Sequence, residues 1–232
     1  MIRLEDVTFR YEDMAMNFDL AVSKGEFVGV IGPSGAGKST LLSLIAGFDL
    51  PVAGRISLAG ADMEGVLPGQ RPVSMIFQDH NGFAHLDVWT NVALGISPRL
   101  KLDPTQRESV DSALARVGLS DFKSRKPTEL SGGERQRIGI ARALVRDRPV
   151  LLLDEPFTAL GPALRREMLD LIKEIQKERN LTILMVTHQP EDAEYAASRI
   201  AFVQAGRIAH VLPAKKFFAT SAPAEIRAYL SA

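Results

Sequence analysis

Cysteine is absent from this chain of 232 residues. That absence excludes disulfide bonds, thiolate metal sites and a cysteine nucleophile. Four histidines are present, but their spacing is not that of a metal-ligand cluster. An excess of charge is absent as well, because 28 lysines and arginines balance 28 aspartates and glutamates. No net positive field draws the chain to nucleic acid, and we expect no nucleic-acid partner.

Long hydrophobic runs are also missing. The longest apolar stretch, Leu41–Phe48, is far shorter than the roughly 20 residues that cross a bilayer as a helix. The N-terminal residues Met1–Asp6 carry charges where a secretion signal would be apolar. With 46% hydrophobic and 24% charged residues, the composition is that of an ordinary globular domain. We therefore expect a folded, cytosolic protein.

The most informative stretch, residues 32–40, reads Gly-Pro-Ser-Gly-Ala-Gly-Lys-Ser-Thr. Its three glycines leave the backbone free to wrap around a phosphate chain with the N–H groups turned inward. A buried strand is predicted at 26–31 and a helix from residue 41, so the stretch lies at a helix start, where anions are held best. A glycine-rich turn with an incidental lysine is the alternative, and it leaves the full pattern unexplained. We infer a nucleoside triphosphate site.

Within this site, Lys38 is placed to reach the β- and γ-phosphates, and the Ser39 hydroxyl to ligate Mg²⁺. The predicted nucleotide-binding residues are Gly32, Pro33, Ser34, Gly35, Ala36, Gly37, Lys38, Ser39 and Thr40.

The rest of the chain alternates between strand and helix patterns. Residues 2–31 suit short antiparallel strands. Further strands are predicted at 55–59, 73–77, 150–153, 181–186 and 200–203, with a helix at 163–178. Between about 79 and 148, apolar residues recur at helical spacing instead. These patterns predict one α/β domain with a mainly parallel sheet, whose core at about 1–78 and 149–232 is interrupted by a helical insertion at about 79–148.

Polar residues follow several of the predicted strands. Asp154 ends the apolar strand at 150–153 and is placed to hold Mg²⁺ through its water shell, and Glu155 could orient and deprotonate a water. Gln78 could touch both the metal and the attacking water, and His188 could hydrogen-bond the γ-phosphate. Surface acids, a polar loop residue and a structural histidine are the respective alternatives. Their common place at the ends of strands beside the phosphate-binding stretch favours a hydrolytic site.

A second distinctive stretch, Leu130–Arg137, reads Leu-Ser-Gly-Gly-Glu-Arg-Gln-Arg. Ser131 and Glu134 have the spacing of a capping box at a helix start. Gly132 and Gly133 weaken the first turn by roughly 1 kcal/mol each relative to alanine. That cost is understandable if another body must approach the backbone closely. We therefore predict a second anion-binding helix start, in an insertion that does not readily fold back onto its own phosphate loop.

In this order, the phosphate loop, Gln78, Leu130–Arg137, the Leu-Leu-Asp-Glu-Pro stretch that ends at Pro156, and His188 resemble the ATPase subunits of ATP-binding cassette transporters. The resemblance covers residues 1 to about 212. It implies a P-loop NTPase core with an N-terminal antiparallel β subdomain and an inserted α-helical subdomain. It also implies ATP and Mg²⁺ as cofactors, and hydrolysis coupled to transport.

The resemblance further implies a head-to-tail homodimer, in which ATP on the loop of one subunit is completed by the other. The residues expected to contact this ATP in trans are Ser131, Gly132, Gly133 and Glu134. Tyr11 is the expected adenine-stacking aromatic, with a turn-flanking tyrosine as the alternative. A separate integral membrane permease is the implied partner, with an indirect link to a periplasmic or extracellular solute-binding protein. The expected location is peripheral, on the cytoplasmic face of the inner membrane.

Within that family, Arg71–Gln78, Gly47-Phe48, Pro98–Leu102 and Asp154–Leu160 resemble the subfamily that serves bacterial thiamine importers. The implied function is to power uptake of thiamine or its phosphate esters. The transported molecule never touches this subunit, so importers of iron, polyamines or inorganic anions stay open as alternatives. A soluble cassette protein without a transport role, and a plain P-loop kinase or GTPase, are the competing classes.

Three further positions carry expectations. The family normally has an aspartate where this chain has Gly161, so coupling between the two catalytic sites is expected to be looser. Between Asp79 and Trp89, Phe83 is expected to lie in a groove that accepts a short helix of the permease, whereas Trp89 is expected to be buried within the insertion.

Overall fold

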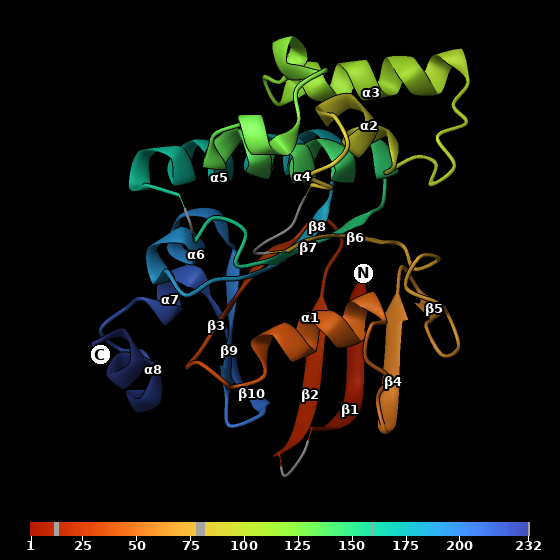
Figure 1. Ribbon diagram of the computed structural model, residues 1–232. Coiled ribbons are helices and arrows are strands. Elements are labelled where there is room, and N and C mark those ends of the chain that lie inside the picture. Colours follow the sequence, from red (N-terminus) through yellow and green to blue (C-terminus); the bar gives the residue numbers. More distant parts are fainter. Residues whose placement is uncertain (12–13, 78–81, 159, 232) are drawn as a thin grey trace.

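The computed structural model describes residues 1–11, 14–77, 82–158 and 160–231. In the described part of the chain, one curled sheet of ten strands is covered by helices (Figure 1). The strands are β1 (Ile2–Tyr11), β2 (Met14–Val22), β3 (Phe27–Ile31), β4 (Ala53–Leu58), β5 (Ala61–Asp62), β6 (Val73–Ile76), β7 (Val150–Asp154), β8 (Thr182–Val186), β9 (Arg199–Gln204) and β10 (Arg207–Pro213).

The helices are α1 (Lys38–Ala46), α2 (Val88–Ala93), α3 (Pro104–Arg116), α4 (Gly132–Arg146), α5 (Pro162–Arg179), α6 (Pro190–Ala196), α7 (Ala214–Phe217) and α8 (Ala224–Leu230). Short 3-10 turns lie at Ser120–Phe122 and Pro127–Glu129. The described residues between 82 and 148 contain helices and turns but no strand, as their apolar spacing predicts.

The sheet joins a parallel half to an antiparallel half. Its strand order is β5-β4-β1-β2-β10-β9-β3-β8-β7-β6. Strands β9, β3, β8, β7 and β6 run parallel, whereas β1, β2, β4 and β5 pair in antiparallel fashion. Strand β10 returns beside β9 and touches β2 through the pair Arg207 and Asn17. The predicted fold class, a mainly parallel α/β sheet with an antiparallel β region at the N-terminus, is confirmed.

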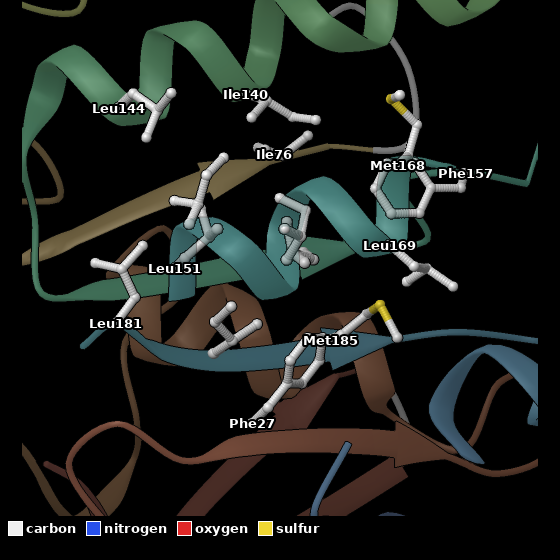
Figure 2. Packing of buried hydrophobic residues seen from close by; sticks show 14 of the residues in the cluster. Phe27, Ile76, Ile140, Leu144, Leu151, Phe157, Met168, Leu169, Leu181 and Met185 are labelled. Atoms are coloured by element: carbon white, nitrogen blue, oxygen red, sulfur yellow. The ribbon is translucent and has the colours of Figure 1, made fainter. Parts of the chain in front are cut away.

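Alternate residues of the central strands face two separate cores. Leu151 and Leu153 of β7 pack with α2, α3, α4 and α5, whereas Val150 and Leu152 pack with α1 and the antiparallel strands. Figure 2 shows the first core, where Ile140 and Leu144 of α4 lie over the sheet. Because successive side chains of a strand point to opposite faces, α1 and α4 cover opposite faces of the sheet. The run of apolar residues in β7 and β8 reflects this double burial.

A buried arginine ties the end of α1 to the segment before β6. Arg71 is 2% exposed, and its Nη1 donates to the carbonyls of Leu44 at 2.8 Å and Ile45 at 2.9 Å, in the last turn of α1. Its Nε and Nη2 donate to the carbonyls of Val66 and Met63. A guanidinium satisfies these carbonyls together because its donors form a rigid planar fork.

We expect Arg71→Lys to lower the free energy of unfolding by about 3 kcal/mol, because a lysine ammonium cannot reach all four carbonyls and leaves some unpaired. Urea denaturation followed by circular dichroism measures this. The control is Arg55→Lys, whose side chain is 66% exposed and pairs only with Asp62, and which should change stability by less than about 0.5 kcal/mol. Equal effects of the two substitutions would contradict the role of Arg71.

Candidate active site

The phosphate loop connects β3 to α1, and its geometry demands glycine at two positions. A Cβ on Gly32 would lie 1.9 Å from the carbonyl oxygen of Val203 in β9, so no side chain fits there. Gly37 has a φ of 101° and precedes the first residue of α1, with Met16 of β2 close by. The loop is thus pressed between the sheet and the helix start, and the free N–H groups of the first helical turn are available to an anion.

Lys38 begins α1 and is only 5% exposed. Its Nζ donates to the carbonyl oxygens of Gly32 and Pro33, both at 2.8 Å. Burial lowers the pKa of this amine, and the nearby carboxylates of Glu155 and Asp154 raise it in turn. The ammonium is therefore held inside the loop, next to the two acids that end β7.

The ends of the parallel strands bring the predicted acids and histidine together. Strands β3, β8 and β7 are neighbours and run in the same direction, so the residues after each strand lie at one edge of the sheet. Asp154 ends β7 and accepts a hydrogen bond from the Ser39 hydroxyl at 3.1 Å. His188 follows β8, and its Nε2 lies 2.5 Å from Oε1 of Glu155.

Glu155 adopts an unusual backbone conformation. Its φ of 48° places it in the left-handed region, which costs an ordinary residue roughly 1–2 kcal/mol. The N–H of Glu155 donates to the carbonyl of Val186 at 3.0 Å, which locks the chain in this conformation. The turn directs the carboxylate toward His188, and its side chain is 12% exposed. A general base needs this combination of partial burial and access to one polar partner.

The structure also explains how His188 is held, which the sequence analysis did not foresee. Thr187, the residue between β8 and the histidine, is 5% exposed. Its Oγ1 accepts the N–H of Gln189 at 3.0 Å, closing a tight turn around His188. The sequence signal for this turn is a threonine at the end of a strand, because threonine hydroxyls commonly form turns.

The oxygen atoms of Ser39 and Asp154 fit a magnesium ion. Ser39 Oγ lies 3.1 Å from Asp154 Oδ1, so the hydroxyl would bind the ion directly and the carboxylate would hold it through a coordinated water. Burial raises the pKa of Asp154, and the Ser39 hydrogen bond opposes this. Among the described residues, no group of three histidine, aspartate or glutamate side chains could hold a metal ion.

Gln78 lies outside the described residues, so its predicted role as metal ligand and water contact stays a prediction. Tyr11 is the last residue of β1, and its side chain is 61% exposed. It pairs with Met14 of β2, two residues before the Met16 that contacts the phosphate loop at Gly37. An exposed ring at this end of the sheet is available for stacking on a base. The adenine role of Tyr11 also stays a prediction.

The start of α4 has the predicted capping box. The Glu134 carboxylate accepts hydrogen bonds from the N–H and the hydroxyl of Ser131, both at 2.7 Å, and these bonds lower its pKa. The Glu134 N–H donates back to the Ser131 hydroxyl at 3.4 Å. This arrangement leaves other N–H groups of the first turn open to an anion.

The two glycines of this turn differ in their surroundings. A Cβ on Gly133 would lie 2.3 Å from Leu164 of α5, so packing within the chain already requires glycine there. A Cβ on Gly132 would meet only Leu160, at 3.8 Å. Packing within the chain therefore accounts for Gly133 but not for Gly132, where the approach of a second body stays a prediction. That packing joins α4 to α5, and the sequence alone gave no sign of it.

Gly161 is the N-cap residue of α5, and it has no side chain that could accept a hydrogen bond from the first turn. Its φ of −65° and ψ of 160° are accessible to any residue, and a Cβ there would meet no atom within 4 Å. An aspartate would therefore fit and could cap the first turn of α5, which has no side-chain cap. The backbone conformation itself does not require glycine, and the expected effect on coupling stays a prediction.

Phe83 and Trp89 differ as expected in exposure. Trp89 packs against the core of the helical region, and its Nε1 donates to Asp111 at 3.1 Å. Phe83 is 49% exposed, with the Arg142 guanidinium 5.3 Å from its ring centre. Trp89 is thus partly buried against the insertion, less completely than expected, whereas a docking role for Phe83 stays a prediction.

The arrangement of loop, acids and helix starts can be compared with known proteins. The family model for the ABC transporter matches residues 15–158. The chain belongs to the ABC transporter family. This membership agrees with the resemblance seen in the sequence. The ATP-binding subunits of this family are ATPases. Among the described residues, no helix combines the length and the apolar character needed to cross a membrane.

Curated relatives align along almost the whole chain. The thiamine import ATP-binding protein ThiQ of Brucella suis is 53% identical over 99% of this chain and 95% of its own length. The protein of the same name from Mesorhizobium japonicum is 51% identical over 100% and 91%. That from Salmonella paratyphi A is 53% identical over 90% and 89%.

Solved structures of ATP-binding cassettes share this architecture. The dimeric cassette MJ0796 bound to ADP and Pi superposes with a TM-score of 0.80 at 29% identity, covering 92% of this chain and 99% of its own. The cassette cbiO1 from Clostridium perfringens, part of the ABC transporter complex cbiONQ, has a TM-score of 0.85 at 29% identity, covering 94% and 90%. The predicted P-loop NTPase fold is therefore confirmed.

The site geometry makes a sharp prediction for Glu155. Replacing it with glutamine keeps the shape but removes the base, so Glu155→Gln should hydrolyse ATP at least about 10²-fold more slowly. Binding of ATP with Mg²⁺ should stay near that of the unmodified protein. Phosphate release and fluorescent-nucleotide titration measure the two quantities.

The matched control is Glu26→Gln, because the Glu26 side chain is also 12% exposed and pairs with Arg199, away from the site. It should leave turnover within about twofold. Near-normal turnover of Glu155→Gln would move the role of base to another group, with His188 the first candidate.

Proposed function

We propose that this chain is the ATP-hydrolysing subunit of an importer for thiamine or its phosphate esters. The observation that carries the proposal is the combination of two facts. First, Lys38, Asp154, Glu155 and His188 meet at the edge of the sheet where the parallel strands end. Second, relatives named as thiamine import ATP-binding proteins share about half of their aligned residues with this chain, along nearly its full length. The geometry of the site supports ATP hydrolysis, and the names of the relatives support thiamine as the transported solute.

The residues divide the work of hydrolysis. The N–H groups of the loop and of α1 receive the phosphate chain, and the Lys38 ammonium turns to the β- and γ-phosphates. Ser39 and Asp154 would hold Mg²⁺, which neutralises charge that develops on the phosphates. Glu155 accepts a proton from the attacking water. His188, at 2.5 Å from that carboxylate, orients it and can donate to the γ-phosphate.

The opposite placement of α1 and α4 favours a dimer with shared sites. Because the two helices lie on opposite faces of the sheet, Ser131 and Gly132 of one chain cannot close over the phosphate loop of the same chain. In a head-to-tail homodimer, each start of α4 would meet the loop of the other subunit. Both halves are intact in this chain, so two equivalent sites related by a two-fold axis follow.

An exposed aromatic surface suits the membrane partner. Phe48, two residues after the end of α1, and Phe77, directly after β6, are both exposed, with ring centres 5.9 Å apart. Phe83 is the next exposed aromatic along the chain. Exposed apolar surface of this kind marks protein contacts. We assign these residues to the contact with a permease, which would hold this subunit at the cytoplasmic face of the inner membrane and link it indirectly to a solute-binding protein.

Shared sites can be tested by mixing two inactive variants. Lys38→Ala destroys the loop half of each site, and Ser131→Arg blocks the other half. A mixed dimer contains one undamaged site, so an equal mixture should regain about a quarter of the unmodified ATPase rate, because half of the dimers are mixed and each has one of two sites. Each variant alone should stay inactive. Absence of recovery, with subunit exchange confirmed by differently labelled chains, would contradict sharing.

The solute is tested by uptake in cells whose own copy of this gene is deleted. Labelled thiamine should enter when the unmodified chain is supplied and should fall to background with Glu155→Gln, because the importer then lacks its source of free energy. Uptake of iron, spermidine and sulfate serves as the control and should be unchanged in every strain. Loss of one of those solutes with thiamine uptake intact would reject thiamine while leaving ATP hydrolysis in place.

A further inference from the structure

Helix α6 starts two residues after His188, and apolar packing alone gives it little support. Of its seven residues, all of which the structure describes, only Ala193 is buried. This alanine packs on β3, where a Cβ on Gly29 would lie 2.9 Å from the alanine methyl. In Figure 1, α6 lies beside the first turns of α5. Polar contacts between these two helices therefore help to decide how α6, and with it the turn at His188, is oriented.

The first of these contacts is an ion pair between Arg165 of α5 and Asp192 of α6. Arg165 Nε lies 3.8 Å from Asp192 Oδ2, which is an ion-pair distance rather than a hydrogen bond. The two side chains are only 17% and 13% exposed. Burial raises the pKa of the Asp192 carboxyl, and the Arg165 guanidinium opposes that rise. Because both groups are largely buried, salt and water screen their attraction less than they screen a surface pair.

The arginine is anchored on the side of the chain that carries Glu155. Its Nη2 donates to the carbonyl of Leu160 at 3.1 Å, and its backbone N–H donates to the carbonyl of Gly161 at 3.0 Å. The Thr158 hydroxyl donates to the carbonyl of Glu155 at 3.2 Å. The guanidinium is thus fixed to the segment that leads from Glu155 into α5.

The aspartate is anchored on the side that carries His188. The N–H of Asp192 donates to the carbonyl of Gln189 at 3.1 Å, and the N–H of Gln189 donates to the Thr187 hydroxyl at 3.0 Å. His188 lies inside this short hydrogen-bonded segment. The ion pair therefore joins the two segments whose side chains meet where His188 Nε2 lies 2.5 Å from Glu155 Oε1.

The other end of α6 is held to α5 by different groups. The Tyr195 hydroxyl hydrogen-bonds to Asp170, and Lys173 Nζ lies 3.9 Å from the centre of the tyrosine ring. The same ammonium donates to the Tyr195 carbonyl at 3.2 Å. Loss of the Arg165–Asp192 pair should therefore loosen the start of α6 while its end stays attached.

We propose that Arg165 and Asp192 form a positioning pair for ATP hydrolysis, which holds His188 beside Glu155. The pair acts through the chain segments on either side of the site, so its loss should affect the chemical step and not the binding of the nucleotide. This role in hydrolysis rests on the proposed function, whereas the link between α5 and α6 does not.

The test is Asp192→Asn, which keeps the shape of the side chain and removes its charge. We expect kcat to fall about threefold to tenfold with the KM for ATP within about twofold, because a start of α6 that is no longer held displaces His188 but leaves the phosphate loop intact. Hydrogen exchange measured by mass spectrometry should be faster in peptides that cover residues 187–197 and unchanged in those that cover 30–46.

The matched control is Glu191→Gln, because Glu191 is exposed and lies in the same turn of α6, so the same charge is lost from the same helix start. This variant should keep kcat within about twofold and should not change the exchange. Asp192→Glu preserves the charge and should also keep kcat within about twofold. Thermal melting followed by circular dichroism ensures that every variant is assayed while folded.

A positioning role through His188 also predicts that the effects are not additive. Adding Asp192→Asn to His188→Gln should slow hydrolysis no further than His188→Gln alone, whereas multiplied losses would overturn the proposal. Equal effects of Asp192→Asn and Glu191→Gln would overturn it too, as would unchanged exchange at 187–197 or faster exchange throughout the core. If the chain did not hydrolyse ATP, the exchange measurement would still decide whether the pair links α5 to α6.

Discussion

The parallel pairing of β3, β8 and β7 is the constraint on which the site depends. Each of these strands is apolar on both faces, and burying both faces requires helices on each side of the sheet. Strands fixed in this way end at one common edge. The phosphate loop, Asp154, Glu155 and His188 meet there because the pairing puts their strands in contact, although they are far apart in the sequence.

Because both faces of the sheet are buried, the phosphate loop and the start of α4 lie on opposite sides of the same chain. The face that carries α1 presents the phosphate loop, and the face that carries α4 presents Ser131 and Gly132. The two halves of the proposed composite site thus lie on opposite faces of the sheet in one chain. This geometry gives the proposed dimer, in which the start of α4 meets the phosphate loop of another subunit, a physical basis beyond the family resemblance.

Close backbone approach is the second recurring feature of the site. Gly32 lies against Val203, and Gly133 lies against Leu164, so each glycine permits a contact that any side chain would prevent. Glu155 is the opposite case, because a residue with a side chain accepts a left-handed conformation that glycine would adopt more easily. The backbone strain is tolerated because the Glu155 N–H is bonded to Val186, and the carboxylate gains its place beside His188.

The sequence by itself determined the fold class, the loop at 32–40, the capping box of Ser131 and Glu134, and the strands that end at Asp154 and before His188. These features are local, because periodicity, glycine spacing and capping act within a few residues. Only the tertiary structure decided that Leu164 leaves little room for a side chain at Gly133 and that Arg71 closes the end of α1. Each of these contacts joins residues distant in the chain. Such contacts depend on how the sheet curls and how the helices pack, which no local pattern records.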